Sequence, residues 1–257
     1  MKKLAWITGA STGIGAETAK QLAKQGWKVV VSARSEDKLI ALEKEFPGKI
    51  YAYPCDMTKS TQVVETVRRI EDEVGAIDLA FLNAGMFIPD TYDNFTAENF
   101  KRHYEVNVFG VIHAVAPVLE RFKQRGQGHF AMTASVAGYQ GLPRSMSYGS
   151  TKAALINFAE SLWIECRDHN IKVQVVCPGF IETPMTSGNK FPMPMKMKVD
   201  KAVEKLIEGL NSDRFEITFP RPFSWILKTI HSLPYGLRLW LVHWGTQRAM
   251  AKGKAKQ

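Results

Sequence analysis

The chain has 257 residues, of which 45% are hydrophobic and 23% charged, and its formal net charge is +9. This length and composition are typical of one large folded domain and exclude a disordered or fibrous protein. No apolar run approaches a transmembrane helix, no signal-peptide pattern precedes the first strand, and the three cysteines lack the spacing of metal ligands. We therefore expect a cytoplasmic protein with reduced thiols and no metal site.

Short β-type runs alternate with helical patterns over residues 1–219. Strands are predicted at residues 4–8, 28–33, 50–54, 78–82, 128–133, 171–177 and 215–219. Helices are predicted between them at residues 14–25, 36–46, 59–74, 96–124, 147–169 and 199–210. Because strands and helices alternate, we expect one α/β domain: a single Rossmann-like, doubly wound parallel sheet of about seven strands, with helices on both faces.

Residues 220–257 exceed what this sheet needs and form a C-terminal extension. From residue 221 onward there are seven Lys or Arg residues and no Asp or Glu, which leaves only +2 for the first 220 residues. Apolar residues recur at helical spacing on both sides of Pro234, which predicts two short amphipathic helices: Phe223, Ile226, Leu227, Ile230 and Leu233 before it, and Leu237, Trp240, Leu241 and Trp244 after it. Residues 251–257 are expected to be disordered.

Two readings of this extension remain open. Helices with Trp, Tyr and positive charge only are typical of a peripheral anchor on an anionic membrane, here on its inner face. Alternatively, the apolar faces pack on the body of the protein or on a second subunit. A nucleic acid would also match the charge, but no other feature supports one and we expect none.

The first predicted strand runs directly into a glycine-rich turn and then a helix. The turn reads Thr-Gly-Ala-Ser-Thr-Gly-Ile-Gly over residues 8–15, with the glycines spaced Gly-x-x-x-Gly-x-Gly. Such glycines permit a tight turn and a close approach of the backbone to a pyrophosphate at a helix N-terminus. The turn therefore predicts a dinucleotide site formed by Gly9, Ser11, Thr12, Gly13, Ile14 and Gly15.

The end of the second predicted strand indicates which dinucleotide binds. An acidic residue there would accept the ribose hydroxyls and repel a 2′-phosphate, but the sequence has Ala33 followed by Arg34. A guanidinium matches phosphate through two parallel hydrogen bonds, and the Ser11 hydroxyl is a further donor. We therefore predict NADP(H) rather than NAD(H). The alternative is that Arg34 is an ordinary solvated charge.

Tyr148 and Lys152 lie four residues apart at the start of the predicted helix 147–169, so their side chains share one face. A free tyrosine has a pKa near 10, and a neighbouring ammonium favours the phenolate. Lowering the pKa to about 7 needs roughly 4 kcal/mol, which is large for one exposed neighbour. A second positive charge, such as an oxidised nicotinamide ring, would have to contribute.

With these motifs and others in the same order, the sequence resembles the classical short-chain dehydrogenases/reductases, in their NADP-preferring subgroup, over residues 1–219. The further matches are Asp56, Asn83-Ala84-Gly85, Asn107, Ser135 thirteen residues before Tyr148, Pro178-Gly179 and Thr183. The resemblance implies a catalytic set of Asn107, Ser135, Tyr148 and Lys152. It also implies cofactor contacts from Tyr148, Lys152, Asp56, Met57, Asn83, Ala84, Gly85, Pro178, Gly179, Ile181 and Thr183.

The resemblance implies a role for each catalytic residue. Ser135 would hydrogen-bond the substrate carbonyl oxygen, and Tyr148 would exchange the proton with it. Lys152 would hold the nicotinamide ribose and lower the pKa of Tyr148, while Asn107 would hold a water that connects Lys152 to solvent. The cofactor supplies the hydride, so the reaction needs neither a metal nor a covalent intermediate.

Loops after the strands are the expected substrate end: residues 86–88, 137–143 and 185–198. The candidate substrate contacts are Ser135, Ala137, Met86, Met185 and Phe191. Met193, Met195 and Met197 alternate in the last loop, which predicts a mobile apolar lid because methionine adapts to varied apolar ligands. Alternatively, these side chains only pack the loop onto the body.

These observations favour an NADPH-dependent oxidoreductase that reduces an apolar, lipid-like ketone or aldehyde, with Tyr148 as the general acid. The alternative is an NADP-dependent alcohol or hydroxysteroid-type dehydrogenase that runs in the oxidative direction. A third reading, a non-catalytic dinucleotide-binding scaffold, is disfavoured by the intact catalytic set. The resemblance also implies a homodimer or homotetramer formed through the predicted helices 96–124 and 147–169.

Overall fold

The computed structural model describes residues 3–189 and 191–254. Within them, one seven-stranded sheet has the order β3-β2-β1-β4-β5-β6-β7, and all neighbouring strands are parallel. The strands are β1 (Leu4–Thr8), β2 (Lys28–Ser32), β3 (Ile50–Ala52), β4 (Leu79–Leu82), β5 (Gly128–Thr133), β6 (Ile171–Pro178) and β7 (Glu216–Phe219). The predicted fold class is confirmed, and the strand bounds differ from the prediction by one or two residues at their ends.

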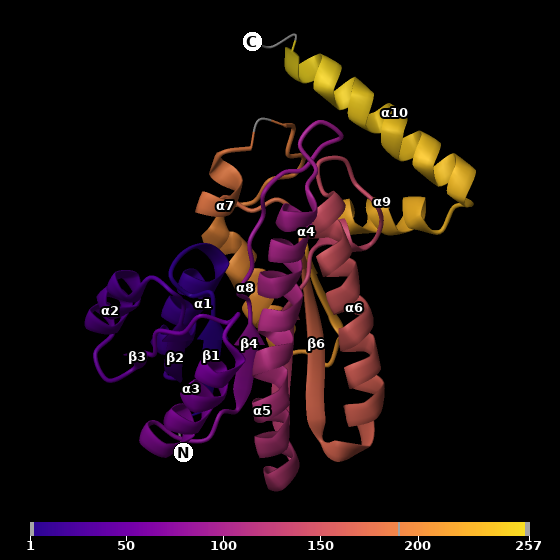
Figure 1. The fold of residues 1–257 in the computed structure, drawn as a ribbon. Helices are drawn as coiled ribbons and strands as arrows, with labels where there is room; N and C mark the ends of the chain where they lie inside the picture. Colours follow the sequence, from indigo (N-terminus) through magenta and orange to yellow (C-terminus); the bar gives the residue numbers. More distant parts are fainter. Residues whose placement is uncertain (1–2, 190, 255–257) are drawn as a thin grey trace.

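Helices cover both faces of the sheet (Figure 1). The first eight are α1 (Gly13–Lys24), α2 (Glu36–Glu45), α3 (Ser60–Glu73), α4 (Ala97–Tyr104), α5 (Gly110–Arg125), α6 (Met146–Cys166), α7 (Pro184–Ser187) and α8 (Val199–Leu210). Side chains of α3, α5 and α6, such as Val67, Phe122 and Leu155, form the core on one face. Those of α1, α2 and α8, including Leu22 and Leu206, form the core on the other. Central strands are therefore buried on both faces, as β1 is along its whole length.

The predicted helical stretch 96–124 is confirmed over residues 97–125, but it is not α-helical throughout. The hydroxyl of Thr96 caps α4 by accepting from the Asn99 N–H at 3.1 Å. A π-helical segment over Glu105–Phe109 then interrupts the regular pattern before α5 begins at Gly110. A π-helical turn contains one additional residue and occurs often at functional sites. Here it contains Asn107, a member of the predicted catalytic set.

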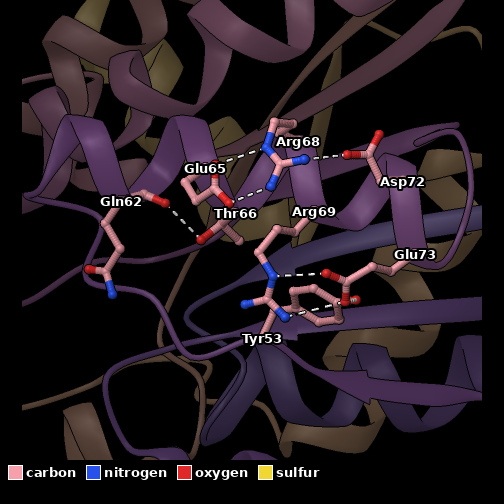
Figure 2. A network of polar contacts seen from close by, with 8 residues as sticks. All are labelled: Tyr53, Gln62, Glu65, Thr66, Arg68, Arg69, Asp72 and Glu73. Carbon is pink, nitrogen blue, oxygen red and sulfur yellow. Dashed lines mark hydrogen bonds and ion pairs between the residues drawn. The ribbon is translucent and has the colours of Figure 1, made fainter.

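The outer surface of α3 carries a network of ion pairs, which Figure 2 shows from close by. Arg68 pairs with Glu65 and Asp72 within the helix. Arg69 pairs with Glu73, which also accepts a 2.6 Å hydrogen bond from the Tyr53 hydroxyl, just after β3. Exposed pairs of this kind contribute little to stability, because water and salt screen the charges. The apolar face of α3 therefore holds the helix on the sheet, and the network mainly joins it to the end of β3.

The C-terminal extension forms two helices, α9 (Arg221–His231) and α10 (Tyr235–Lys254). The expected break lies at Pro234, but the two helices differ. Apolar residues of α9 lie on one face, whereas exposed apolar side chains surround α10, with Tyr235 and Leu239 opposite Leu237 and Trp244. The prediction of a second amphipathic helix is thus wrong, because apolar residues such as Tyr235 and Leu239 also lie on the face opposite the expected apolar stripe.

Two further expectations concern the C-terminal end. Helix α10 continues to Lys254, so disorder over residues 251–254 is not observed, and residues 255–257 lie outside the described residues. Among the residues that the structure describes, none of the helices is long and apolar enough to cross a membrane.

Candidate functional site

A cleft with a volume of about 320 Å³ opens at the C-terminal ends of the strands. In an open parallel sheet this edge is where ligands bind, beside the point at which the strand order reverses. That point lies between β1 and β4 here. Of the predicted site residues, those on the cleft wall are Gly9, Ser11, Thr12, Gly13, Ile14, Arg34, Asp56, Met57, Asn83, Ala84, Gly85, Met86, Ser135, Tyr148, Lys152, Pro178, Gly179, Ile181, Thr183 and Met185.

The glycine-rich turn forms the floor of the cleft. Gly9 has a φ of +66°, and a Cβ there would lie 2.7 Å from the Cα of Ala84. Gly13 has a φ of +59° at the start of α1, and a Cβ there would lie 3.2 Å from a Thr183 side-chain carbon. Both positions therefore require glycine. Gly15 does not line the cleft but lies behind the turn. A Cβ at Gly15 would lie 2.5 Å from the Gly9 carbonyl oxygen.

Asn83 ties the turn to the neighbouring strand ends. Its backbone N–H donates to the Thr8 hydroxyl at 3.0 Å, and its side-chain amide donates to the carbonyl oxygens of Thr8 and Gly9, both at 3.3 Å. Its amide oxygen accepts from the Thr133 hydroxyl at 3.2 Å. Because these bonds join β1, β4 and β5, the turn is held rigidly at the edge of the sheet.

At the β2 side of the cleft, Arg34 is exposed on the wall, with Ser11 also on the wall. Among the described residues, no carboxylate forms an ion pair with Arg34, so its guanidinium is available to an anion in the cleft. A second arginine, Arg102 of α4, also lines the cleft. The sequence analysis did not identify Arg102, because it is one of several basic residues in that helix and has no motif around it.

Asp56 lies on the same wall and is held in place by its neighbours. Its carboxylate accepts from the N–H and the hydroxyl of Thr58, at 3.0 and 2.9 Å. Its own N–H donates to the side chain of Gln62 at 3.0 Å.

The predicted catalytic residues meet where β5 and β6 end and α6 begins. Lys152 is buried, and its Nζ donates to the Thr133 carbonyl oxygen at 2.7 Å. The same Nζ lies 5.5 Å from the centre of the Tyr148 ring. The hydroxyl of Ser135 accepts from the Ala137 N–H at 3.1 Å and has only a long, 3.5 Å contact with the Pro178 carbonyl oxygen. It therefore keeps a proton that it can donate into the cleft.

Burial moves the two pKa values of the Tyr148–Lys152 pair in opposite directions. Burial raises the pKa of Tyr148 to about 12, and the nearby Ser135 hydroxyl opposes the rise. Burial lowers the pKa of Lys152 to about 8. The Lys152 ammonium is directed at Thr133, and the expected lowering of the Tyr148 pKa also requires the positive charge of an oxidised nicotinamide, so it stays a prediction. A protonated tyrosine at neutral pH is the form that can donate a proton.

Asn107 is fully buried and does not line the cleft. Its side-chain oxygen accepts from the Met86 N–H at 2.8 Å, and its amide donates to the Met86 carbonyl oxygen and the Thr151 hydroxyl, both at 3.1 Å. Gly85 allows this approach, since a Cβ there would lie 3.3 Å from Asn107 Oδ1 and 3.6 Å from Lys152 Nζ. With its side chain fully engaged, Asn107 could hold a water only through its backbone.

A loop after β4 packs directly on α6, the helix with the predicted catalytic residues Tyr148 and Lys152. The ring of Phe87 meets Tyr148 edge-on, with centroids 5.0 Å apart. Buried Asp90 accepts hydrogen bonds from the Ser147 N–H, at 2.8 Å, and from the Ser147 hydroxyl, and so caps the first turn of α6. The Ile88 N–H donates to the ring of His103 at 3.1 Å. Sequence reasoning missed Asp90, because a cap supplied from 57 residues away has no local signal.

The expected substrate residues divide into two groups. Met86, Met185 and Ser135 line the cleft, whereas Ala137 and Phe191 do not. Phe191 packs on Phe180 at 6.1 Å between ring centroids, within the segment predicted as a lid. Part of that segment faces solvent, since 45% of Met185 and 48% of Met195 are exposed. Lys190 lies outside the described residues.

The residues present fit a nicotinamide dinucleotide. The backbone of the turn is bare of side chains where a pyrophosphate would approach, and the N-terminus of α1 adds N–H groups. Among the described residues no cluster of His, Cys, Asp or Glu could hold a metal ion. The arrangement can therefore bind a dinucleotide in an extended cleft and present a tyrosine and a serine to a substrate beside it.

Comparisons with known proteins agree with this geometry. Residues 3–191 match the family model described as short chain dehydrogenase. A 3-oxoacyl-[acyl-carrier-protein] reductase of Thermotoga maritima is 33% identical over 216 residues, which cover 83% of this chain and 84% of that protein. A 3-ketoacyl-(acyl-carrier-protein) reductase of Brucella melitensis, solved with NADH, superimposes with a TM-score of 0.77 at 26% identity and covers 85% of this chain and 98% of its own. The protein ElxO, solved with NADP, has a TM-score of 0.75 at 25% identity, with the same coverage.

Proposed function

Because the chain belongs to the short-chain dehydrogenase family, we propose that this oxidoreductase uses NADPH to reduce an apolar, lipid-like ketone or aldehyde. The observation that carries the proposal is the buried Tyr148–Lys152 pair on one face of α6, with Ser135 beside it on the cleft wall. A bound nicotinamide dinucleotide supplies the hydride. The protein then has to orient the carbonyl group and deliver one proton.

Ser135 orients the carbonyl group, and Tyr148 delivers the proton. The Ser135 hydroxyl donates a hydrogen bond to the carbonyl oxygen, on which negative charge develops. Tyr148 donates the proton to the same oxygen. Burial favours the protonated phenol of Tyr148, which is the form that donates a proton. Lys152 holds the nicotinamide ribose, and Asn107 holds the water that links Lys152 to solvent.

Members of this family bind NAD or NADP, and we assign NADP(H) to this chain. The support is Arg34 at the end of β2, exposed on the cleft wall where an acidic residue would disfavour a 2′-phosphate, with Ser11 also on that wall. The remaining contacts proposed for the dinucleotide come from the glycine-rich turn, Asp56, Met57, residues 83–85, Tyr148, Lys152, Pro178, Gly179, Ile181 and Thr183.

The apolar substrate is proposed from the lining of the cleft. Met86 and Met185 flank the catalytic end, and Phe87 covers one side of Tyr148. The two 3-oxoacyl reductases among the relatives act, by their names, on carbonyl groups of acyl chains. The second candidate is an NADP-dependent alcohol or hydroxysteroid-type dehydrogenase. Arg34 argues against it, because a preference for NADP(H) favours the reductive direction.

Two proposals concern assembly. We expect a homodimer or homotetramer formed through α4–α5 and α6. We also expect peripheral association with an anionic membrane through residues 221–257, whose positive charge is not offset by any acidic residue. Substrate would then reach the cleft from a lipid surface.

The reaction is tested by following NADPH oxidation with a series of methyl ketones of increasing chain length. We expect kcat/KM to rise roughly three- to fourfold for each methylene that enters the apolar cleft. The Tyr148→Phe variant should keep NADPH binding, measured by fluorescence, and lose about a hundredfold or more in kcat. Near-normal turnover by this variant would contradict the assignment of Tyr148. Turnover only with alcohols and NADP⁺ would favour the second candidate.

The cofactor assignment has its own test. Arg34→Asp removes the phosphate-binding guanidinium and introduces a carboxylate that can accept the ribose hydroxyls. We expect the ratio of NADPH to NADH efficiency to fall about tenfold or more. Arg69→Asp, a matched charge reversal on α3 outside the cleft, should leave the ratio unchanged. If Arg34→Asp kept its NADPH preference, Arg34 would be an ordinary solvated charge.

A further inference from the structure

The first helix of the extension belongs to the enzyme body. Leu227 and Ser224 of α9 are buried. The ring of Phe223 packs on Phe180 with centroids 5.7 Å apart, and Phe180 in turn contacts Phe191 of the predicted lid. Lys228 pairs with Glu216 of β7. The helix therefore supports the lid and closes the edge of the sheet.

A second contact of Glu216 extends to the catalytic loop. Its carboxylate accepts a hydrogen bond from the Tyr139 hydroxyl, four residues after Ser135, at 2.5 Å. The α9 helix is thus joined to both sides of the substrate end, through Phe223 on the lid side and through Lys228 and Glu216 on the Ser135 side.

The second helix behaves differently, because most of its large apolar side chains face solvent. Exposed fractions are 73% for Tyr235, 48% for Leu237, 56% for Leu239, 57% for Trp240 and 48% for Trp244. Trp240 and Trp244 stack on each other rather than on the body, with ring centroids 6.1 Å apart. A stable water-exposed helix does not normally display so many aromatic and aliphatic groups, so this surface requires an apolar partner.

Charge decides between the two partners that could cover α10. The extension contains seven basic residues and no acidic residue, and Arg248 lies over the Trp244 ring at 5.1 Å. A symmetric contact between two copies of α10 would bring the basic side chains of one copy close to those of the other. An anionic lipid surface complements them, and Trp and Tyr are the residues that prefer its interface.

The position of α10 gives this contact a direction. Figure 1 shows α10 at the end of the molecule where the strands have their C-terminal ends, beyond α9 and the loop before α4, opposite the N-terminus. Apolar side chains of the substrate loops are also exposed, including Ile88 and Met195. At the junction, Arg238 donates to His231 Nδ1 and to its carbonyl oxygen, at 3.1 and 3.2 Å, and so fixes the angle between α9 and α10.

We propose that α10 docks the protein on an anionic membrane with the substrate loops facing the lipid, so that an apolar carbonyl substrate enters the cleft directly from the bilayer. The interaction surface consists of Leu237, Trp240 and Trp244, which share one face of α10, with the substrate loops beside them. The route of the substrate rests on the proposed function, whereas the contact with lipid does not.

Vesicle sedimentation with the full-length protein tests the contact. The probes are vesicles of phosphatidylcholine alone and vesicles that also contain phosphatidylglycerol. We expect binding to the anionic vesicles only, and at least about a tenfold weaker partition for Trp240→Ser/Trp244→Ser. Val64→Ser, which removes an exposed apolar side chain from α3, should bind as the parent does. Equal binding by the parent and the double variant would overturn the proposal, as would equal binding to both vesicles.

Two further measurements separate the remaining outcomes. If light scattering showed that the double variant had fewer subunits than the parent, α10 would be a subunit contact and the membrane assignment would be wrong. A long-chain ketone supplied in the anionic vesicles should be reduced faster by the parent than by the double variant. Vesicle binding without any carbonyl reduction would reject the proposed reaction and keep the docking surface. Carbonyl reduction without vesicle binding would keep the proposed reaction and reject the docking surface.

Discussion

Burial at Lys152 illustrates how function and stability oppose each other at a single residue. Its ammonium is 2% exposed and forms one hydrogen bond, to the Thr133 carbonyl oxygen. The pKa of Lys152 falls from 10.5 to about 8, so the folded state binds this proton less tightly than the unfolded state does. Below pH 8 the buried ammonium therefore lowers the free energy of unfolding. This free energy rises as the pH increases from about 8 towards 10.5, because only the unfolded state is then protonated at Lys152.

Replacing Lys152 should therefore stabilise the fold at neutral pH. The pKa shift sets an upper limit of roughly 3 kcal/mol, and loss of the bond to Thr133 offsets about 1 kcal/mol of it. We expect Lys152→Met to raise the free energy of unfolding by about 1–2 kcal/mol at pH 7, with the gain shrinking by pH 10. Urea unfolding at both pH values measures this. Lys205→Met, on the exposed surface of α8, should change little at either pH, and a Lys152→Met variant less stable at pH 7 would refute the argument.

At the scale of elements, the site depends on how a loop and a helix are joined. Residues 86–90 lie between β4 and α4, and Asp90 caps the first turn of α6 from there. The other oxygen of Asp90, Oδ1, has no partner among the described residues. The loop also carries Phe87 onto Tyr148 and fixes Met86 against Asn107. Asp90 is thus a positioning residue for the substrate side of the cleft.

Two substitutions at Asp90 separate positioning from general stability. Asp90→Ala leaves the Ser147 N–H without an acceptor and should cost about 1–3 kcal/mol. It should also raise KM for a ketone several-fold more than KM for NADPH, because the loop contacts the substrate end. Asp90→Asn keeps one acceptor oxygen and should restore most of the ketone KM. If Ala and Asn variants had the same KM values as the parent, the cap would have no part in substrate binding.

At the scale of the whole molecule, the helices with the catalytic residues also offer a surface for assembly. Figure 1 shows α4 and α5 end to end in one line, and α6 contacts α4 and the π-helical segment between them. Phe109, within the π-helical segment, is 47% exposed, and Ile164 of α6 is 65% exposed. Apolar side chains exposed on neighbouring helices are typical of a subunit contact. This contact would brace Asn107 and Tyr148 from outside.

An acidic substitution tests that contact. Ile164→Glu places a charge at the centre of the proposed interface and should shift the protein from dimer or tetramer to monomer in size-exclusion chromatography with light scattering. Val64→Glu makes the same change on α3 and should leave the assembly intact. A parent protein that is already monomeric, or an Ile164→Glu protein with unchanged mass, would contradict the proposed interface.

The local features of this protein could be predicted from the sequence, because they depend on residues close together in the chain. Alternation of strands and helices determined the parallel sheet, the glycine spacing determined the turn at α1, and Tyr148 with Lys152 share a face because they are four residues apart. The element bounds differ mainly at helix ends, where capping contacts decide the last residue.

Only the tertiary structure decided the features that depend on distant contacts. The π-helical segment at Asn107 follows from packing against residue 86, the cap of α6 comes from Asp90, and Arg102 reaches the cleft by the placement of α4. The same is true of the extension, where one helix packs into the body and the other remains exposed. Burial also moves the pKa values of Tyr148 and Lys152, which spacing alone does not indicate. Spacing along the sequence indicates which side chains are neighbours on one helix or turn. Their hydration and long-range contacts depend on how the rest of the folded chain surrounds those side chains.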